Sequence, residues 1–170
     1  LGCIHVQLAK AKGAGKIILI ELSSQRIEFI KKFTQPDVII NPSLEDGIKR
    51  VLEETEGRGA DKIIVACPSG RAQEDSLQMV SPRGIVNFFG GLPLDEPFIK
   101  FNSNLVHYRE FYVVGTHGSA PYHNQLALSL LSQGKVKVKE LISHRLPLEK
   151  LEEGLHLAES QKGMKILIMS

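Results

Sequence analysis

The first 22 residues, LGCIHVQLAKAKGAGKIILIEL (residues 1–22), decide the fold class of this chain. Apolar residues recur at helical spacing over residues 1–11, and Gly13 and Gly15 follow, which predicts a helix that ends at these glycines. Residues 16–21 then form a short β-branched apolar run that closes on an acid, a pattern typical of a buried parallel strand. A helix, a glycine turn and a strand that closes on an acid form the second half of a strand–helix–strand unit, so we expect the first strand and its Gly-x-Gly turn to lie upstream of residue 1.

The same alternation of helix and strand continues along the chain. Further strands are expected at residues 37–41, 61–67, 84–91 and 111–118. Further helices are expected at residues 23–33, 43–57, 70–80 and 121–135. Parallel strands need crossovers of about a dozen residues, so this alternation predicts an α/β fold with a doubly wound parallel sheet. The tail, residues 140–170, predicts a strand, a proline turn, a helix and a strand.

Two of the helices carry specific expectations about their ends and faces. For the helix at 43–57 we expect Ser43 as the N-cap, with two acids, Glu45 and Asp46, in the first turn. In the helix at 121–135 the apolar spacing predicts that three leucines face the core. These leucines are Leu126, Leu130 and Leu131.

The composition is that of an ordinary globular domain. The chain has 170 residues, of which 42% are hydrophobic and 24% charged, and its net charge is +2. This charge gives no argument for nucleic acid or a membrane surface as a partner, and no apolar run reaches the length of a membrane span. The sequence shows no signal peptide and no CxxC pair, and each of its two cysteines falls in an apolar run. We therefore expect a cytoplasmic protein in which Cys3 and Cys67 are reduced, buried thiols.

Residues able to bind a ligand gather where the predicted strands end. In an open parallel sheet, ligands bind beyond the carboxyl ends of the strands. The sequence places there Glu21, Asn41, Cys67, Pro68, Ser69, Phe89, Gly90, Gly91, Thr116, His117 and Gly118. A carboxylate after the second strand can accept both ribose hydroxyls of an adenosine and would repel a 2′-phosphate, so Glu21 favours NAD over NADP. The alternatives are a solvated carboxylate at residue 21 and a simple turn at the glycine pair.

Two further residues complete this candidate site. Gly2 has the position of the third glycine of a G-x-G-x-x-G motif, where a small residue lets the first helix pack closely on the sheet. Arg26 lies on the first turn of the next helix, where it could cover an adenine or be an ordinary surface arginine. No histidine pair has the spacing of a helical zinc site and Ser69 lacks a G-x-S-x-G elbow, so neither a metal site nor a serine nucleophile is predicted.

Four stretches of the sequence resemble a known family. They are GRGADKIIVACPSG (57–70), GIVNFFGGLP (84–93), NLVHYREFYVVGTHGSAP (104–121) and LISHRLPLEKLEEGLHLAESQKGMKILI (141–168). These residues resemble the cofactor-binding half of zinc-dependent medium-chain alcohol dehydrogenases. The nearest branch is that of sorbitol (polyol) and threonine dehydrogenases, and the resemblance runs the full length of the chain.

The resemblance implies part of a two-domain enzyme that oxidises a secondary alcohol or polyol with NAD. A zinc ion in the parent protein would polarise the alcohol oxygen while the nicotinamide accepts a hydride. The strand at 111–116 resembles an edge that pairs across a dimer. The residues that would contact the cofactor are Gly2 and Glu21 at the pyrophosphate and adenosine ribose, Arg26 near the adenine, residues 66–69 on the adenine side, and residues 89–91 and 116–118 facing the nicotinamide.

The resemblance also implies how the chain is organised. Residues 1–135 would form a dinucleotide-binding Rossmann domain without its first strand, and residues 136–170 a segment that returns to a catalytic domain. In the strand order 3-2-1-4-5-6 the first strand is central, so the strands on either side of it should lack a neighbour. The family's zinc ligands come from that other domain, so we expect this chain alone to be inactive, with no catalytic or metal-binding residue of its own. Pro68 departs from the family, which more often has a polar residue there.

Three other interpretations stay open. The chain could be a non-catalytic nucleotide-binding module. It could be an S-adenosylmethionine-dependent methyltransferase, whose sheet also ends its second strand in an acid, although NFFGGLP (87–93) and the tail argue against this. It could also belong to a zinc-free quinone reductase of the same superfamily, which Glu21 disfavours because many of those enzymes prefer NADPH.

Overall fold

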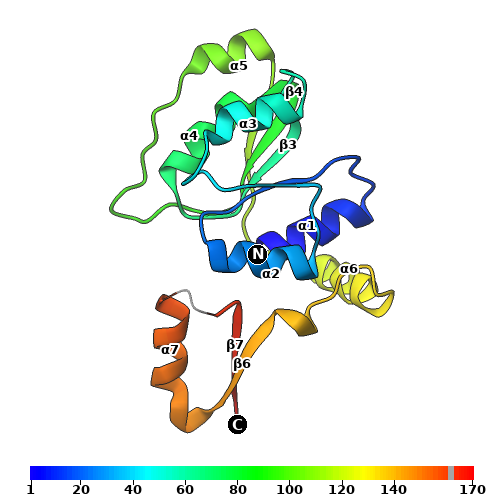
Figure 1. The fold of residues 1–170 in the computed structure, drawn as a ribbon, viewed down its shortest axis with the longest axis vertical. Helices are drawn as coiled ribbons and strands as arrows, with labels where there is room; N and C mark the ends of the chain where they lie inside the picture. The colour runs from blue at the N-terminus through cyan, green and yellow to red at the C-terminus, as the bar shows by residue number, and fades with distance from the viewer. Residues whose placement is uncertain (161–162) are drawn as a thin grey trace. The chain divides into compact units, whose positions relative to one another are not determined.

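The computed structural model describes residues 1–160 and 163–170 and is drawn in Figure 1. The chain divides into two compact units. Unit 1 consists of residues 1–2, 18–22 and 38–120, and unit 2 consists of residues 3–17, 23–37 and 121–170.

Unit 1 is built on parallel strands. Its strands are β1 (Ile18–Ile20), β2 (Val38–Ile40), β3 (Ala60–Val65), β4 (Val80–Phe88) and β5 (Tyr112–Gly115), and its helices are α3 (Gly47–Glu54), α4 (Gly70–Met79) and α5 (Ser103–Arg109). The strands pair in two sheets, β1-β2 and β3-β4-β5, and each pairing is parallel. The predicted parallel α/β architecture is therefore confirmed.

No strand pairing joins the two sheets of unit 1. Within the described residues β1 pairs with β2 alone and β3 with β4 alone, so both strands have an open edge. These are the two strands that the order 3-2-1-4-5-6 places on either side of its central strand, as predicted. An apolar cluster nevertheless links the sheets, because Ile40, Val51 and Met79 are buried and Ile18 of β1 and Ile63 of β3 pack against them.

A second apolar cluster lies between β3-β4-β5 and the helices α4 and α5. Its buried members are Val65, Leu77, Val80, Val86 and Phe111. Val86 is fully buried, whereas its neighbours on β4, Ile85 and Asn87, face the other side of the sheet because side chains alternate along a strand. That other side is exposed, and it carries Ile64 (45% exposed), Tyr112 (63%) and Val114 (40%).

The start of α3 differs from the prediction. Asp46 is the N-cap, and its Oδ1 accepts a hydrogen bond of 3.0 Å from the Lys49 amide. Ser43 is not the cap, because its amide donates to the Asn41 side chain (3.0 Å) and holds this segment in a turn. An aspartate at the N-cap also complements the positive end of the helix dipole, which a serine does not.

Two further expectations need correction. The helix α5 lies between the strands expected at 84–91 and 111–118, where no element is predicted; Asn102 caps it, and its Leu105 and Val106 pack on the core. Cys3 is buried as predicted, but Cys67 is exposed, because the chain leaves β3 before it reaches this residue.

No helix in the described part of the chain is long and apolar enough to cross a membrane.

Within its described residues, unit 2 combines four α-helices and two short 3-10 helices with a two-stranded sheet. Its elements are α1 (Gly2–Ala11, of which Gly2 belongs to unit 1), α2 (Ser24–Phe33), α6 (Pro121–Ser132), η1 (Lys139–Leu141), β6 (Ile142–Pro147), η2 (Leu148–Lys150), α7 (Leu151–Glu159) and β7 (Lys165–Met169). The Gln7 side chain ties α1 to the segment after α6, because it accepts from the Lys137 amide (2.7 Å) and donates to the Lys137 carbonyl (3.0 Å).

The leucines of α6 are less buried than predicted. No residue of α6 is buried, and Leu131 is 38% exposed, so its assignment to the core is wrong. Leu126 and Leu130 are half-buried. The helical spacing was sufficient to predict α6, but spacing alone does not say what covers the apolar face.

The tail folds as a strand–helix–strand unit, as predicted. β6 and β7 pair in parallel, and α7 connects them. A Cβ at Gly154 of α7 would lie 2.8 Å from Ile168 and 3.5 Å from Leu146, so the absence of a side chain lets the helix approach both strands closely.

Candidate functional site

The carboxyl ends of β1 and β3 lie close together in unit 1. Glu21 follows β1, and its amide donates to the Ile40 carbonyl of β2 (3.0 Å). Although Cys67 is exposed, the protein around its thiol removes part of the surrounding water, and this desolvation, followed by the negative charge of Glu21, raises the pKa of the thiol. Glu21 follows β1 and Cys67 follows β3, so both come after the carboxyl end of a parallel strand, the end at which open α/β sheets bind ligands.

Gly90 fixes the loop after β4 against the end of β3. Its amide donates to the Val65 carbonyl (2.8 Å). A Cβ at residue 90 would lie 2.7 Å from the Cys67 carbonyl oxygen and 3.0 Å from the Cys67 nitrogen, so a side chain would not fit without displacing backbone. The glycine is therefore required by close approach of two backbones, and the alternative of a simple turn does not account for this packing.

Gln73 of α4, which is not among the predicted site residues, also holds this loop. The side chain is 5% exposed, and its Nε2 donates to the Gly90 carbonyl at 3.2 Å. A buried amide normally needs such a partner. The available signal was its helical phase, because Gln73 shares a face with the buried Ser76 and Leu77.

The helix α4 begins a few residues after the carboxyl end of β3. Ser69 is its N-cap, and its Oγ accepts from the Ala72 amide (3.3 Å). The residue before it, Pro68, is exposed. A capped helix end at the carboxyl edge of a parallel sheet supplies partial positive charge where an anionic ligand would bind.

The loop after β5 is tied to β4 by one side-chain hydrogen bond. Thr116 donates from its hydroxyl to the Oδ1 atom of Asn87 on β4 (3.3 Å). Gly118 has φ +71°, in the left-handed region that glycine adopts readily, and His117 and Gly118 are exposed. Phe89 is 39% exposed and Gly91 has open space around it, so this edge is accessible to a ligand.

Gly2 and Arg26 are the two remaining predicted site residues. A Cβ at Gly2 would meet Leu19 of β1 at 3.5 Å, an ordinary van der Waals distance, so this contact leaves room for a methyl group. Arg26 belongs to unit 2, where its amide donates to the Oγ of Ser23 (3.3 Å). Its Nε atom is buried without a hydrogen-bond partner among the described residues. Such an atom costs free energy unless a ligand or water satisfies it.

A metal does not fit the described residues. No group of three or more His, Cys, Asp or Glu side chains in residues 1–160 and 163–170 could hold a metal ion. A dinucleotide fits better, because the site offers a carboxylate for a ribose, a capped helix end for phosphate oxygens and a glycine at a close backbone approach.

The comparisons with known proteins identify the family. A model of the zinc-binding dehydrogenase family matches residues 1–133. This chain belongs to the zinc-binding dehydrogenase family. The family predicted from the four sequence stretches is thereby confirmed.

Relatives with curated names are dehydrogenases and reductases. The chain is 34% identical to L-threonine 3-dehydrogenase of Pyrococcus abyssi over 171 aligned positions, which cover 99% of this chain and 48% of that protein. It is 33% identical to D-xylulose reductase A of Aspergillus oryzae (99% and 47% covered) and 29% identical to sorbitol dehydrogenase of Halalkalibacterium halodurans (99% and 48%). The chain spans about half the length of each of these relatives.

Solved structures show the same fold. An alcohol dehydrogenase from Thermotoga maritima superposes with a TM-score of 0.88 at 26% identity, covering 99% of this chain and 47% of that one. A zinc-binding dehydrogenase from Sinorhizobium meliloti, solved bound to NADP, superposes with a TM-score of 0.89 at 20% identity, covering 99% and 49%. The chain therefore has a Rossmann-type α/β fold, as predicted.

Proposed function

We propose that this chain is the NAD-binding part of a dehydrogenase that oxidises a small alcohol or polyol by hydride transfer. The observation that carries the proposal is the position of Glu21, which directly follows β1 and whose amide donates to the Ile40 carbonyl of β2 (3.0 Å). A carboxylate at this point of a doubly wound sheet is suited to accept the hydroxyls of an adenosine ribose. The family membership and the threonine, xylulose and sorbitol relatives support the same function.

Each part of the site has a role in this proposal. Glu21 accepts from the ribose, and the family resemblance assigns Arg26 to the adenine. Cys67, Pro68 and the Ser69 cap lie where the adenine half would bind. The two exposed loops, residues 89–91 and 116–118, lie at the nicotinamide end, and Gly2 would approach the pyrophosphate.

The parent enzyme would use zinc to polarise the alcohol oxygen of a secondary alcohol or polyol. The described residues of this chain bring no such set of ligands together, so their part is to bind and orient the dinucleotide. We therefore propose that the chain alone is inactive. Incubated with NAD, zinc and threonine or sorbitol, it is expected to form no NADH; turnover would contradict this.

The edge strand β5 is the proposed contact between two copies of the parent protein. Among the described residues β5 pairs with β4 alone, and its Tyr112 and Val114 are 63% and 40% exposed. An open strand with apolar side chains favours pairing with a second strand. Light scattering of the chain with Val114→Lys, compared with the unmodified chain, tests this: loss of a dimer is the expected result.

The binding experiment separates the candidate cofactors. Calorimetry is carried out with NADH, NADPH and S-adenosylmethionine, on the unmodified chain and on Glu21→Ala. We expect NADH to bind more tightly than NADPH, and Glu21→Ala to weaken NADH binding about tenfold because a charged hydrogen-bond acceptor is lost. Glu152→Gln is the control, because Glu152 is an exposed carboxylate on α7 outside the proposed site. This variant should bind NADH as tightly as the unmodified chain. Binding of S-adenosylmethionine alone would favour the methyltransferase interpretation and overturn the proposal.

A further inference from the structure

Asn87 is an unusual residue for its place in the sheet. It lies on β4, in register with Ile64 of β3 and Val114 of β5, and the neighbouring position on the same side of β4 is Ile85. This face of the sheet is otherwise apolar near the strand ends, and asparagine is among the residues that strands disfavour. A residue that breaks the local rule at the ligand-binding edge is a candidate for a functional role.

Asn87 is bonded to both loops of the nicotinamide end. Its side-chain Oδ1 accepts the hydroxyl hydrogen of Thr116 (3.3 Å), which leads the loop at 116–118. Its backbone carbonyl accepts from the amide of Phe89 (3.0 Å), which leads the loop at 89–91. The structure therefore places the side-chain oxygen toward Thr116 and leaves the amide nitrogen as the other polar end of the group.

The amide nitrogen of Asn87 keeps its hydrogens available. Among the described residues it makes no hydrogen bond, and the side chain is half-buried. A partly desolvated N–H group gains most from a carbonyl-type acceptor. The nicotinamide ring of NAD carries such an acceptor on its carboxamide group.

We propose that Asn87 is a positioning residue for the nicotinamide end, holding Thr116 through its oxygen and donating from its amide nitrogen to the nicotinamide carboxamide. The inference rests on the proposed NAD-binding function. It deepens that function by naming a side chain that distinguishes a ligand with a nicotinamide from one without.

The test compares two ligands that differ only at that end. ADP-ribose contains the adenosine, the pyrophosphate and the second ribose but lacks the nicotinamide, so it reports on the rest of the site. Dissociation constants for NADH and ADP-ribose are measured by calorimetry on the unmodified chain, Asn87→Val and Asn87→Ser. Valine suits a strand and removes both polar groups, while serine keeps a polar side chain that is too short to reach the carboxamide.

Thr116→Val serves as a partner variant, because it removes the hydroxyl but leaves the Asn87 amide nitrogen in place. For both Asn87 variants we expect NADH binding to weaken about fivefold, the value of one neutral hydrogen bond, and ADP-ribose binding to stay within twofold. Thr116→Val should weaken NADH less, and combining it with Asn87→Val should add little, because both changes act on one hydrogen-bonded pair.

The outcomes distinguish the two proposals. Unchanged NADH binding in both Asn87 variants, or an equal loss of NADH and ADP-ribose, overturns the role of Asn87 and leaves the proposed function standing. Failure of the unmodified chain to bind either ligand overturns the proposed function and this inference with it. If Asn87→Val does not fold, Asn87→Ser alone is the test: a loss of NADH binding without a loss of ADP-ribose binding supports the role of Asn87, and any other pattern overturns it.

Discussion

Gly90 shows how a single missing side chain shapes the candidate site. Replacing it by alanine would place a Cβ 2.7–3.0 Å from the backbone of Cys67. We expect Gly90→Ala to lower the free energy of unfolding by about 1–3 kcal/mol, the usual cost of overpacking, as measured by urea denaturation. Gly91→Ala is the control, because nothing lies within 4 Å of its Cβ position and its φ is not left-handed; it should change stability by less than about 0.5 kcal/mol.

The thiol of Cys67 reports on Glu21. Burial and then the Glu21 charge raise the pKa of this thiol, so the neutral form is favoured and alkylation by iodoacetamide should need a higher pH than for a free cysteine. We expect Glu21→Gln to move the pH profile part of the way down, because the burial contribution remains. Mass spectrometry identifies the labelled residue, and Cys3, which is buried, should react slowly. A profile unchanged by Glu21→Gln would contradict the closeness of these two side chains.

Sequence reasoning found some site residues and missed others for a physical reason. Glu21 could be predicted because its position, one residue after an apolar run, is a local property of the chain. Gln73 and Asn87 act on Gly90 and Thr116, which are 17 and 29 residues further along. Hydrogen bonds between such distant residues depend on strand register, and no local pattern encodes them.

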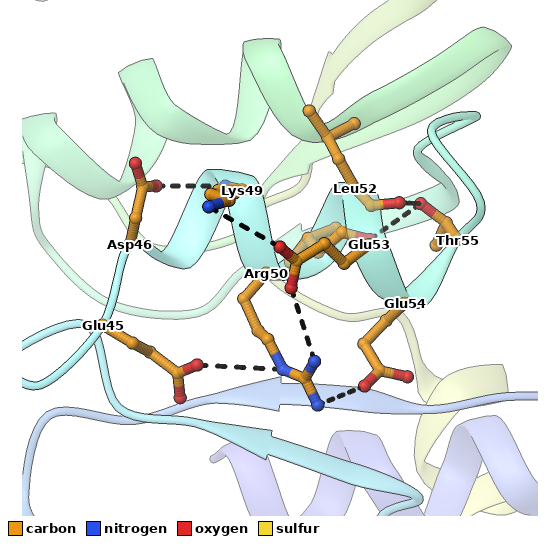
Figure 2. Close-up of polar contacts among 9 residues, drawn as sticks. Glu45, Asp46, Lys49, Arg50, Leu52, Glu53, Glu54 and Thr55 are labelled. Atoms are coloured by element: carbon orange, nitrogen blue, oxygen red, sulfur yellow. Dashed lines mark hydrogen bonds and ion pairs between the residues drawn. The ribbon is translucent and has the colours of Figure 1, made fainter.

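At the scale of an element, α3 is stabilised by charge on its exposed side. Figure 2 shows Arg50 reaching carboxylates before and along the helix: Nε lies 3.7 Å from Glu45, Nη1 3.5 Å from Glu53 and Nη2 2.5 Å from Glu54. An exposed ion pair is worth little alone, but one guanidinium shared by three carboxylates also relieves their mutual repulsion.

We expect Arg50→Gln to destabilise the chain by about 1 kcal/mol at low salt and by less at high salt, since screening weakens both the attraction and the repulsion left behind. Lys49→Gln is the matched control, because Lys49 is 75% exposed and its Nζ lies 3.9 Å from Glu53, and its effect should be below about 0.5 kcal/mol. Urea denaturation of the variants at two salt concentrations measures both effects. A loss for Arg50→Gln that does not depend on salt would argue for packing of its aliphatic stem instead.

The elements themselves were largely predictable, whereas their ends were not. Continuous β-branched runs identified β1 and β2, and alternating helices identified the parallel pairing. The N-cap of α3 was misassigned because Ser43 and Asp46 are both good caps, and the Asn41 turn decides between them. The helix α5 was missed because it is short, with seven residues, and follows a proline-rich stretch.

At the scale of the molecule, the sheets differ in how well each strand is supported. β4 lies between β3 and β5 and contains the fully buried Val86. β1 and β2 have three residues each and pair only with one another within the described part of the chain. A two-stranded sheet is marginal without further support, and here that support comes from the apolar cluster around Ile40 and Val51.

Hydrogen exchange should reveal this difference directly. We expect the amides of β4 to exchange slowest, at rates set by the free energy of global unfolding, and those of β1 at least about tenfold faster through local opening. Adding NADH should slow exchange in β1 more than in β4, because Glu21, at the end of β1, is the proposed ribose ligand. Equal protection of β1 and β4 in the free chain would mean that the cluster around Ile40 joins the two sheets into one cooperative unit despite their unpaired edges.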